Sequence, residues 1–228
     1  MNRLIKSLAG YGLLLFTVYS MLATYGCGDA ATSESEGRIV YSVSIEGEDI
    51  DPMMKAMMPS EIVTHFKGKA TSTVISMGMG AMETRMISDA AMKTYSTLVN
   101  AMGKKVALVL NGDQVMNSFR DRVPLKVRIT DENKEIAGVN CYKVIVTDST
   151  QNTYEVYFTK DLGVADYNWS TPYSEIQGLL MDYSIRFDNV VMKLTAKEIV
   201  REPCDSTMFS VPEGYQIITD PEQMGGVF

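Results

Sequence analysis

Short runs in which apolar and polar residues alternate recur along most of this chain. The first run has apolar residues at every second position, namely Ile39, Tyr41, Val43 and Ile45. Such residues share one face of a β-strand, because successive side chains point to opposite sides. Similar runs cover residues 61–66, 70–76, 84–87, 93–98, 106–110, 125–129, 142–146, 154–158 and 190–196. About ten short strands predict a mainly β protein, with a strongly curved, unclosed, barrel-like antiparallel sheet.

Only a few short segments favour a helix. In Asp51–Met58, the first residue is a suitable N-cap and Pro52 suits the first helical position. Asp113–Arg120 is a second candidate. The third is Ser174–Asp182, in which Ile176, Leu179 and Leu180 have helical spacing. So few helices among so many strands exclude a doubly wound fold.

The first 27 residues have the pattern of a bacterial export signal. Arg3 and Lys6 precede an uncharged, mostly apolar run over residues 8–23, and Cys27 follows the small residue Gly26. We therefore expect a lipoprotein signal peptide over residues 1–26, acylation of Cys27, a tether over 27–36 and one domain over 37–228. The expected location is a lipid-anchored position in the cell envelope, at the outer membrane. An ordinary signal cut nearby is the alternative.

Charge and motifs argue against several functions. The chain has 28 acidic and 21 basic residues, and no basic stripe that would attract phosphate backbones, so no nucleic-acid partner is expected. It has one histidine, His65, and no nucleophile motif or complete phosphate-binding loop. The acids at positions 46–51 do not fit a calcium loop. The sequence thus predicts no enzyme activity, no cofactor and no metal site built from these acids.

Methionine is unusually concentrated between residues 53 and 92. We interpret these residues, with the loop residue Trp169, as contacts for a hydrophobic ligand, because thioether chains form adaptable apolar surfaces. The candidate contacts are Met53, Met54, Met57, Met58, Met77, Met79, Met82, Met86 and Trp169. A methionine-rich core without a guest is equally compatible with the pattern. Copper(I) binding is a less favoured third interpretation.

Two further cysteines, Cys141 and Cys204, have two interpretations. In an oxidising envelope they could form a disulfide. Alternatively, both could be buried free thiols.

Three segments carry a family resemblance. Residues 135–143 read EIAGVNCYK, residues 157–163 read YFTKDLG, and residues 209–215 read FSVPEGY. In this order, and behind such a signal, they resemble the DUF-type envelope lipoproteins of Bacteroidota that are related to the GLPGLI group. The motifs are structural: Gly138, Gly163 and residues 212–214 suit turns. Phe209, Val211 and Tyr215 are suited to docking the chain end on the sheet.

The resemblance implies a fold similar to the Lol-type lipoprotein carriers (LolA/LolB-like), in which an unclosed barrel holds acyl chains under a helical lid. We therefore expect a non-enzymatic envelope lipoprotein that binds a lipid or other hydrophobic molecule in an apolar cavity. The alternative is a protein-interaction or structural module of the envelope with a filled core.

Overall fold

The computed structural model describes residues 35–47, 50–120, 125–164, 166–187 and 190–226. They belong to one compact unit, Ser35–Phe228, which contains all four buried apolar clusters of the described residues. A unit with its own hydrophobic core can fold by itself. The candidate lipidation residue Cys27 and the proposed signal peptide lie outside the described residues.

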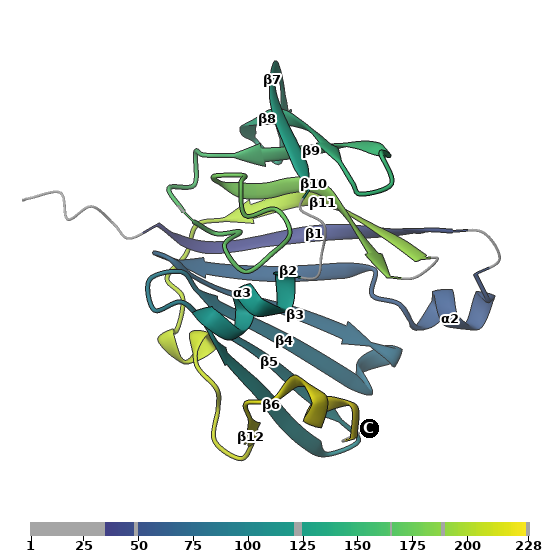
Figure 1. The fold of residues 1–228 in the computed structure, drawn as a ribbon, viewed down its shortest axis with the longest axis vertical. Coiled ribbons are helices and arrows are strands. Elements are labelled where there is room, and N and C mark those ends of the chain that lie inside the picture. The colour runs from purple at the N-terminus through teal and green to yellow at the C-terminus, as the bar shows by residue number, and fades with distance from the viewer. Residues whose placement is uncertain (1–34, 48–49, 121–124, 165, 188–189, 227–228) are drawn as a thin grey trace, which may run out of the picture. The chain divides into compact units, whose positions relative to one another are not determined.

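The unit is built around one mixed sheet of twelve strands, which confirms the predicted mainly β, unclosed fold (Figure 1). The strands are β1 (Glu36–Glu46), β2 (Glu61–Lys67), β3 (Ala70–Met77), β4 (Met82–Asp89), β5 (Thr94–Ala101), β6 (Lys104–Asn111), β7 (Lys126–Ile136), β8 (Val139–Thr147), β9 (Thr153–Thr159), β10 (Leu179–Phe187), β11 (Val190–Val200) and β12 (Gln216–Ile218). The α-helices of the described residues are α2 (Pro52–Met57) and α3 (Gly112–Arg120), and the 3₁₀ segments are η1 (Gly78–Gly80), η2 (Ser206–Phe209) and η3 (Pro221–Gly226).

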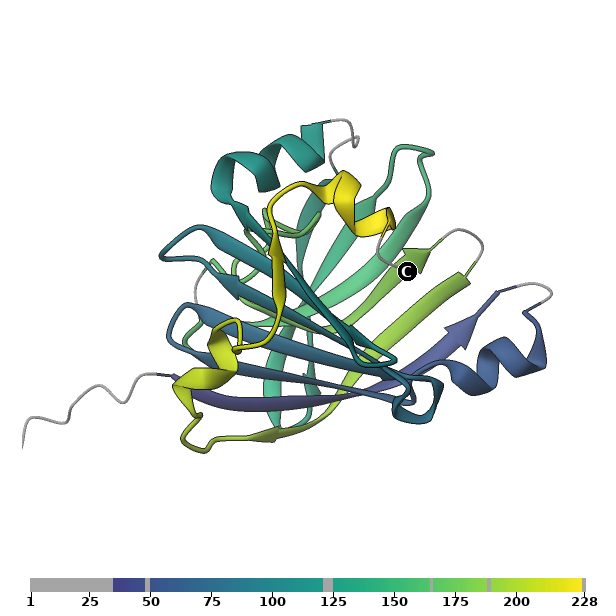
Figure 2. The same ribbon diagram turned by 90° about the horizontal axis from the view of Figure 1, so that it is seen from below.

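The strand order is β12-β6-β5-β4-β3-β2-β1-β11-β10-β9-β8-β7. Neighbouring strands are antiparallel, except that β12 is parallel to β6. The sheet curves, and α3 lies on its concave side (Figure 2). Because β2 to β6 form a continuous meander, the η1 turn and the β5–β6 turn lie at one end, and the β4–β5 turn lies at the other.

Register decides which side chains face the concave side. The predicted alternation of β1 is confirmed, since Ile39 and Tyr41 are fully buried and belong to the largest apolar cluster. On the opposite, convex side a smaller cluster contains Ile87, Leu98 and Ala107. The chain end covers it with Val211 and Tyr215, as the closing motif predicted.

The predicted helix Ser174–Asp182 is wrong, because its second half is part of strand β10. Leu179, Leu180 and Met181 are all buried, so both faces of this strand are covered. A continuous apolar run of this kind also matches helical spacing, and periodicity alone does not separate the two. Gly178 has φ of +142° and lies so close to strand β9 that a Cβ would be 2.3 Å from the Thr159 carbonyl oxygen. Strand β10 therefore depends on a contact that is distant in sequence.

Candidate ligand-binding site

A cavity of about 690 Å³ opens between α3 and the segment 169–174. Its lining residues are Met92, Lys93, Asn111, Gly112, Asp113, Met116, Trp169 and Ser174. A second cavity of about 290 Å³ lies between the same two elements and is lined by Tyr95, Leu110, Val115, Ser118, Ser170, Thr171 and Pro172. We call the two cavities together the α3 cleft.

Hydrogen bonds from buried side chains hold the segment 169–174 in place. The side-chain amide of Asn168 donates to the carbonyl oxygens of Ile176 (2.7 Å) and Gly178 (2.9 Å). The hydroxyls of Ser170 and Ser88 are 3.0 Å apart. The Tyr173 hydroxyl donates to the Ser184 carbonyl oxygen at 2.8 Å. One wall of the cleft is therefore attached to β4 and to β10.

The other wall, α3, is positioned by its first turn. The Asn111 side chain accepts from the Gln114 backbone N–H, and the Gln114 side chain accepts from the Asn111 backbone N–H, each at 3.0 Å. This reciprocal cap satisfies donors that a helix start leaves unpaired. The Gln114 amide also donates to the Thr219 carbonyl oxygen at 2.9 Å. Val115 is buried against β6 and Ile218. These contacts leave Met116 on the solvent side, at 57% exposure.

The cleft combines apolar side chains with a few charged groups. Met92 and Met116 are 71% and 57% exposed, although large apolar side chains usually avoid water. Lys93 and Asp113 supply one charge of each sign. The ammonium of Lys93 lies over the Trp169 ring, 5.0 Å from its centre. Such a surface suits a mainly apolar molecule that carries a small polar group.

Tyrosines line the concave face beyond the cleft. The ring of Tyr183 makes edge-to-face contacts with Tyr41 (5.9 Å) and Tyr173 (6.2 Å between centres). The Tyr41 hydroxyl donates to the Leu180 carbonyl oxygen at 2.8 Å. Burial raises the pKa of Tyr41 and Tyr183 well above the usual value, and it raises the pKa of Tyr167 to about 12. Near neutral pH these phenols are therefore uncharged hydrogen-bonding groups.

The structure places Trp169 in the cleft, but it does not bring the candidate methionines to it. Met53 and Met57 lie on α2, and Met79 lies in η1. Met77 and Met82 are register partners, and Met86 is half-buried farther along the same strand as Met82. Met58 packs against the main core, whereas the side chain of Met54 lies outside the described residues. The meander separates these residues from Trp169, since the β3–β4 turn lies at the opposite end of the sheet.

Of the eight residues that line the cavity of about 690 Å³, sequence reasoning selected only Trp169, and it missed seven, including Met92, Lys93 and Met116. Met92 belongs to the methionine-rich stretch, and this membership could have identified it as a lining residue. Lys93 and Met116 had no such signal, because their neighbours in the cleft come from other strands and loops.

Cys141 and Cys204 are buried free thiols in the structure, which therefore contains no disulfide between them. Cys141 lies in β8, and its Sγ is 3.5 Å from the Val139 carbonyl oxygen. Burial raises the pKa of Cys141 to about 11. The Sγ of Cys204 lies 3.3 Å from the carbonyl oxygen of Gly37. The two thiols thus contact different backbone carbonyl oxygens and not each other.

The described ranges contain neither a candidate metal cluster nor a candidate membrane helix. No three His, Cys, Asp or Glu side chains there are grouped so that they could hold a metal ion. In that same part of the chain, no helix has the length and apolar character needed to cross a bilayer.

Comparison with known proteins shows similarity at the level of the fold. No family model and no curated protein matches the sequence. Among solved structures, the chain is similar to PNGF-II, described in space group C2, with 15% identity and a TM-score of 0.50. The match covers 84% of this chain and 32% of that chain, so this chain spans about a third of the length of PNGF-II. At this identity the likeness shows the fold alone. The fold and the cleft together describe an unclosed β sheet whose concave side carries the main apolar core and the α3 cleft.

Proposed function

We propose that this protein is a non-enzymatic lipoprotein of the cell envelope that binds a lipid or another hydrophobic molecule in the α3 cleft. The observation that carries the proposal is the cavity of about 690 Å³ beside Trp169, Met92 and Met116. Its volume falls within the range of about 300–1,000 Å³ that is typical of small-molecule pockets.

The exposed side chains around the cleft support an apolar guest. A bound hydrocarbon would cover the outer surfaces of Met92 and Met116, which water now contacts. Burial of a methionine side chain is favourable by about 1.5–3 kcal/mol, so covering part of two such chains is a sufficient driving force.

The lining residues also favour binding over catalysis. The lining residues include hydroxyl groups, among them those of Ser118 and Ser174. No histidine that could act as a general base lies among these lining residues. The chain's histidine, His65, lies on β2 opposite Arg38 and Ser72. Acylation of Cys27 remains a proposal from the sequence, as does the envelope location.

The test uses residues 35–228, which contain the complete core. Native mass spectrometry should detect a co-purified lipid, and a fluorescent fatty-acid analogue should bind and change the emission of Trp169, the one tryptophan of the chain. Met116→Asp should weaken probe binding about tenfold or more, because it places a carboxylate against the apolar chain. Met79→Asp is the matched control, since it alters an exposed methionine at the other end of the sheet.

A domain that purifies empty and does not bind the probe would contradict the proposal. Equal effects of Met116→Asp and Met79→Asp would also contradict it, because the α3 cleft would then not be the binding site.

A further inference from the structure

Two opposite charges line the α3 cleft without forming an ion pair. Lys93 and Asp113 both line the cavity of about 690 Å³, together with the apolar side chains of Met92, Met116 and Trp169. Within the part of the chain that the structure describes, neither charged side chain forms a salt bridge, with the other or with a third residue. Both charges are therefore available to a bound molecule.

Lys93 is held in the cleft by contacts with both walls. Its backbone is left-handed, with φ of +52°, a conformation that glycine and asparagine adopt more readily. At Gly112, the first residue of α3, a Cβ would lie 3.2 Å from the Cβ of Lys93, so the lysine side chain packs against the start of the helix. Its ammonium lies 5.0 Å from the centre of the Trp169 ring. A strained backbone position that is fixed by its surroundings is typical of a functional site.

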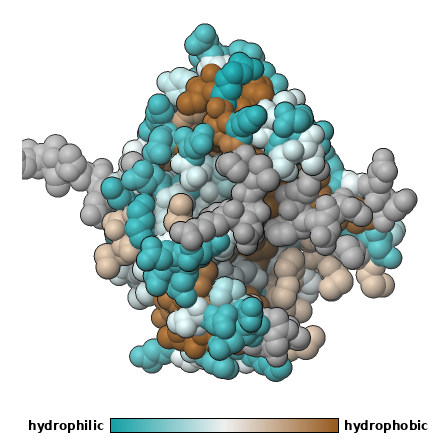
Figure 3. Space-filling view, in the orientation of Figure 1, coloured by the Kyte–Doolittle hydropathy of each residue, from teal (hydrophilic) through white to brown (hydrophobic). Residues whose placement is uncertain are grey.

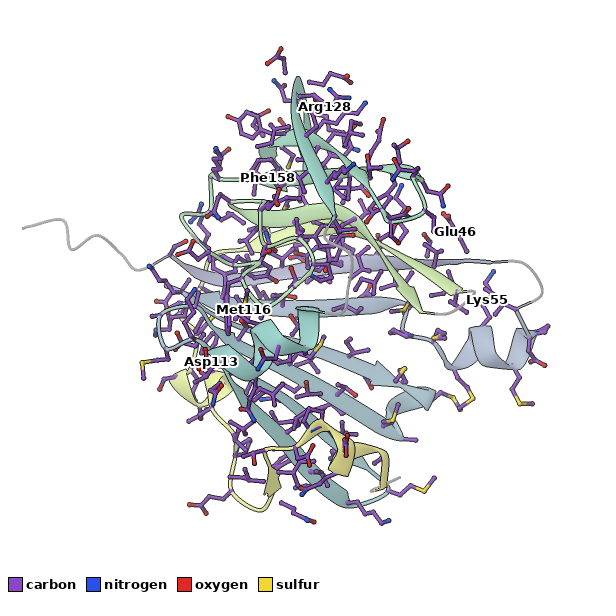
Figure 4. All side chains as sticks on the ribbon, viewed as in Figure 1. Glu46, Lys55, Asp113, Met116, Arg128 and Phe158 are labelled. Carbon is purple, nitrogen blue, oxygen red and sulfur yellow. The ribbon has the colours of Figure 1, made fainter. Side chains whose placement is uncertain are left out.

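Asp113 lies beside Lys93 because it follows Gly112 directly. It belongs to the first turn of α3, which the reciprocal cap of Asn111 and Gln114 fixes. Figure 4 shows Asp113 and Met116 on this same helix, and in Figure 3 the surface over α3 is mainly hydrophilic. The exposed carboxylate of Asp113 thus lies next to the apolar part of the lining.

Other acids in or next to the segments that form the cleft do not change this balance. The carboxylate of Asp89 accepts from two backbone N–H groups of the β4–β5 turn, at 2.8 and 2.9 Å. Asp166 pairs with Lys69, with 3.8 Å between Oδ2 and Nζ. Glu175 is exposed and lines neither cavity. Among the described residues, the lining of the α3 cleft therefore carries one positive and one negative side chain.

We propose that the ligand of the α3 cleft is a single-chain amphiphile with a zwitterionic head group, namely a lysophospholipid that carries a phosphate and an ammonium. This inference rests on the proposed function of the cleft. The acyl chain contacts Met92, Met116 and Trp169, the phosphate pairs with Lys93, and the ammonium pairs with Asp113. A head group with a single charge would satisfy one of these side chains and place its charge near a like charge, which weakens binding.

The experiment is isothermal titration calorimetry of residues 35–228 at low ionic strength, where exposed charges are least screened. It compares three amphiphiles with the same acyl chain, each below its critical micelle concentration. Lysophosphatidylethanolamine is zwitterionic, lysophosphatidylglycerol has the phosphate without the ammonium, and monoacylglycerol is uncharged. We expect lysophosphatidylethanolamine to bind about two- to fivefold more tightly than either of the others, since an exposed ion pair contributes up to that factor.

Two variants remove the charges one at a time. Lys93→Gln should weaken the binding of both lysophospholipids about two- to fivefold, because both phosphates lose the ammonium. Asp113→Asn should weaken lysophosphatidylethanolamine but strengthen lysophosphatidylglycerol, because the carboxylate attracts the ammonium of the first and repels the phosphate of the second. Neither substitution should change the binding of monoacylglycerol. A merely structural effect would instead shift all three affinities in the same direction.

Lys105→Gln and Glu213→Gln are the matched controls. Each removes the same kind of charge outside the cleft, since Lys105 lies over Tyr215 and Glu213 belongs to the chain end that covers the convex side. Neither control should change the order of the three affinities.

Equal affinity for the three amphiphiles, or a preference for lysophosphatidylglycerol, would overturn the zwitterionic ligand. So would a shift of the same sign for both lysophospholipids in Asp113→Asn. Binding of monoacylglycerol that Met116→Asp weakens, without any preference for a head group, rejects this inference and leaves the proposed function in place. If none of the three amphiphiles binds, the proposed function is rejected together with this inference.

Discussion

The ammonium group of Lys93 lies 5.0 Å from the centre of the Trp169 ring, and this contact joins the β4–β5 turn to the loop that forms one wall of the cleft. Lys93 makes the contact from a left-handed backbone conformation, with φ of +52°. The β4–β5 turn and the 169–174 segment thus meet at the cavity of about 690 Å³ in the α3 cleft.

Removal of this charge should be visible in tryptophan fluorescence. Lys93→Met keeps the side-chain length and the backbone strain but removes the cation–π attraction, which contributes about 0.5–1 kcal/mol. We expect a loss of stability of that size and a changed Trp169 emission spectrum. Lys105→Met is the control, because Lys105 lies over Tyr215 instead. Identical spectra for the original protein and Lys93→Met would show that the contact does not persist in solution.

Asn168 should be important for the stability of the cleft wall. It is buried and donates to two backbone carbonyl oxygens, so Asn168→Ala leaves both acceptors unpaired. We expect a loss of about 2–4 kcal/mol in urea unfolding. Asn140→Ala, at an exposed position on β8, should change stability by less than about 0.5 kcal/mol. Comparable effects of the two substitutions would be evidence against the hydrogen bonds from Asn168 to Ile176 and Gly178.

Stability should decrease in alkaline solution. Burial raises the pKa of Tyr41, Tyr183 and Tyr167, so these phenols bind protons in the folded state at pH values where the unfolded chain releases them. Their stabilising contribution is complete below the unfolded pKa of about 10 and is lost as pH rises toward the folded values. Each adds a slope of about −1.4 kcal/mol per pH unit in that window.

The tyrosine prediction is checked by urea midpoints between about pH 9 and 11, since tyrosine in the unfolded chain titrates near 10. Tyr41→Phe should be less stable at neutral pH, because the bond to Leu180 is lost. Its dependence on alkaline pH should nevertheless be weaker. A pH dependence equal to that of the original protein would exclude Tyr41 as a contributor.

Both cysteines of the described unit should be unreactive in the folded state. Cys141 and Cys204 are buried free thiols, and burial raises the pKa of both. In residues 35–228, which lack Cys27, an aromatic disulfide reagent should therefore detect no fast-reacting thiol before denaturation and two thiols afterwards, without reductant. No thiols after denaturation would instead indicate a disulfide between the two cysteines.

Cys27 should carry the lipid anchor that the signal pattern predicts. Intact-mass analysis of the protein from membranes should show acyl chains on a mature N-terminal cysteine. Cys27→Ala should release the protein from the membrane fraction, since stable anchoring needs the hydrocarbon chains. An unmodified mass for the original protein would reject the anchor.

Several features follow from local sequence alone. Alternation in β1 placed Ile39 and Tyr41 on the buried face, because side-chain direction in a strand depends on position along the chain. The Pro52 start of α2 and the turn at Gly138 were also predictable, since backbone conformation there is limited by the residue itself. Loop composition also pointed to Trp169, which the structure places in the lining of the α3 cleft.

Tertiary structure decided the rest. The apolar spacing of Ile176, Leu179 and Leu180 suited a helix, and pairing with β9 and β11 made Leu179 and Leu180 part of a strand covered on both faces. The methionines formed one group in sequence, but the antiparallel meander placed Met79 and Met92 at opposite ends of the sheet. Lys93 meets Trp169 because the β4–β5 turn and the loop after β9 come together in the folded unit, and this long-range contact has no local signal in the sequence.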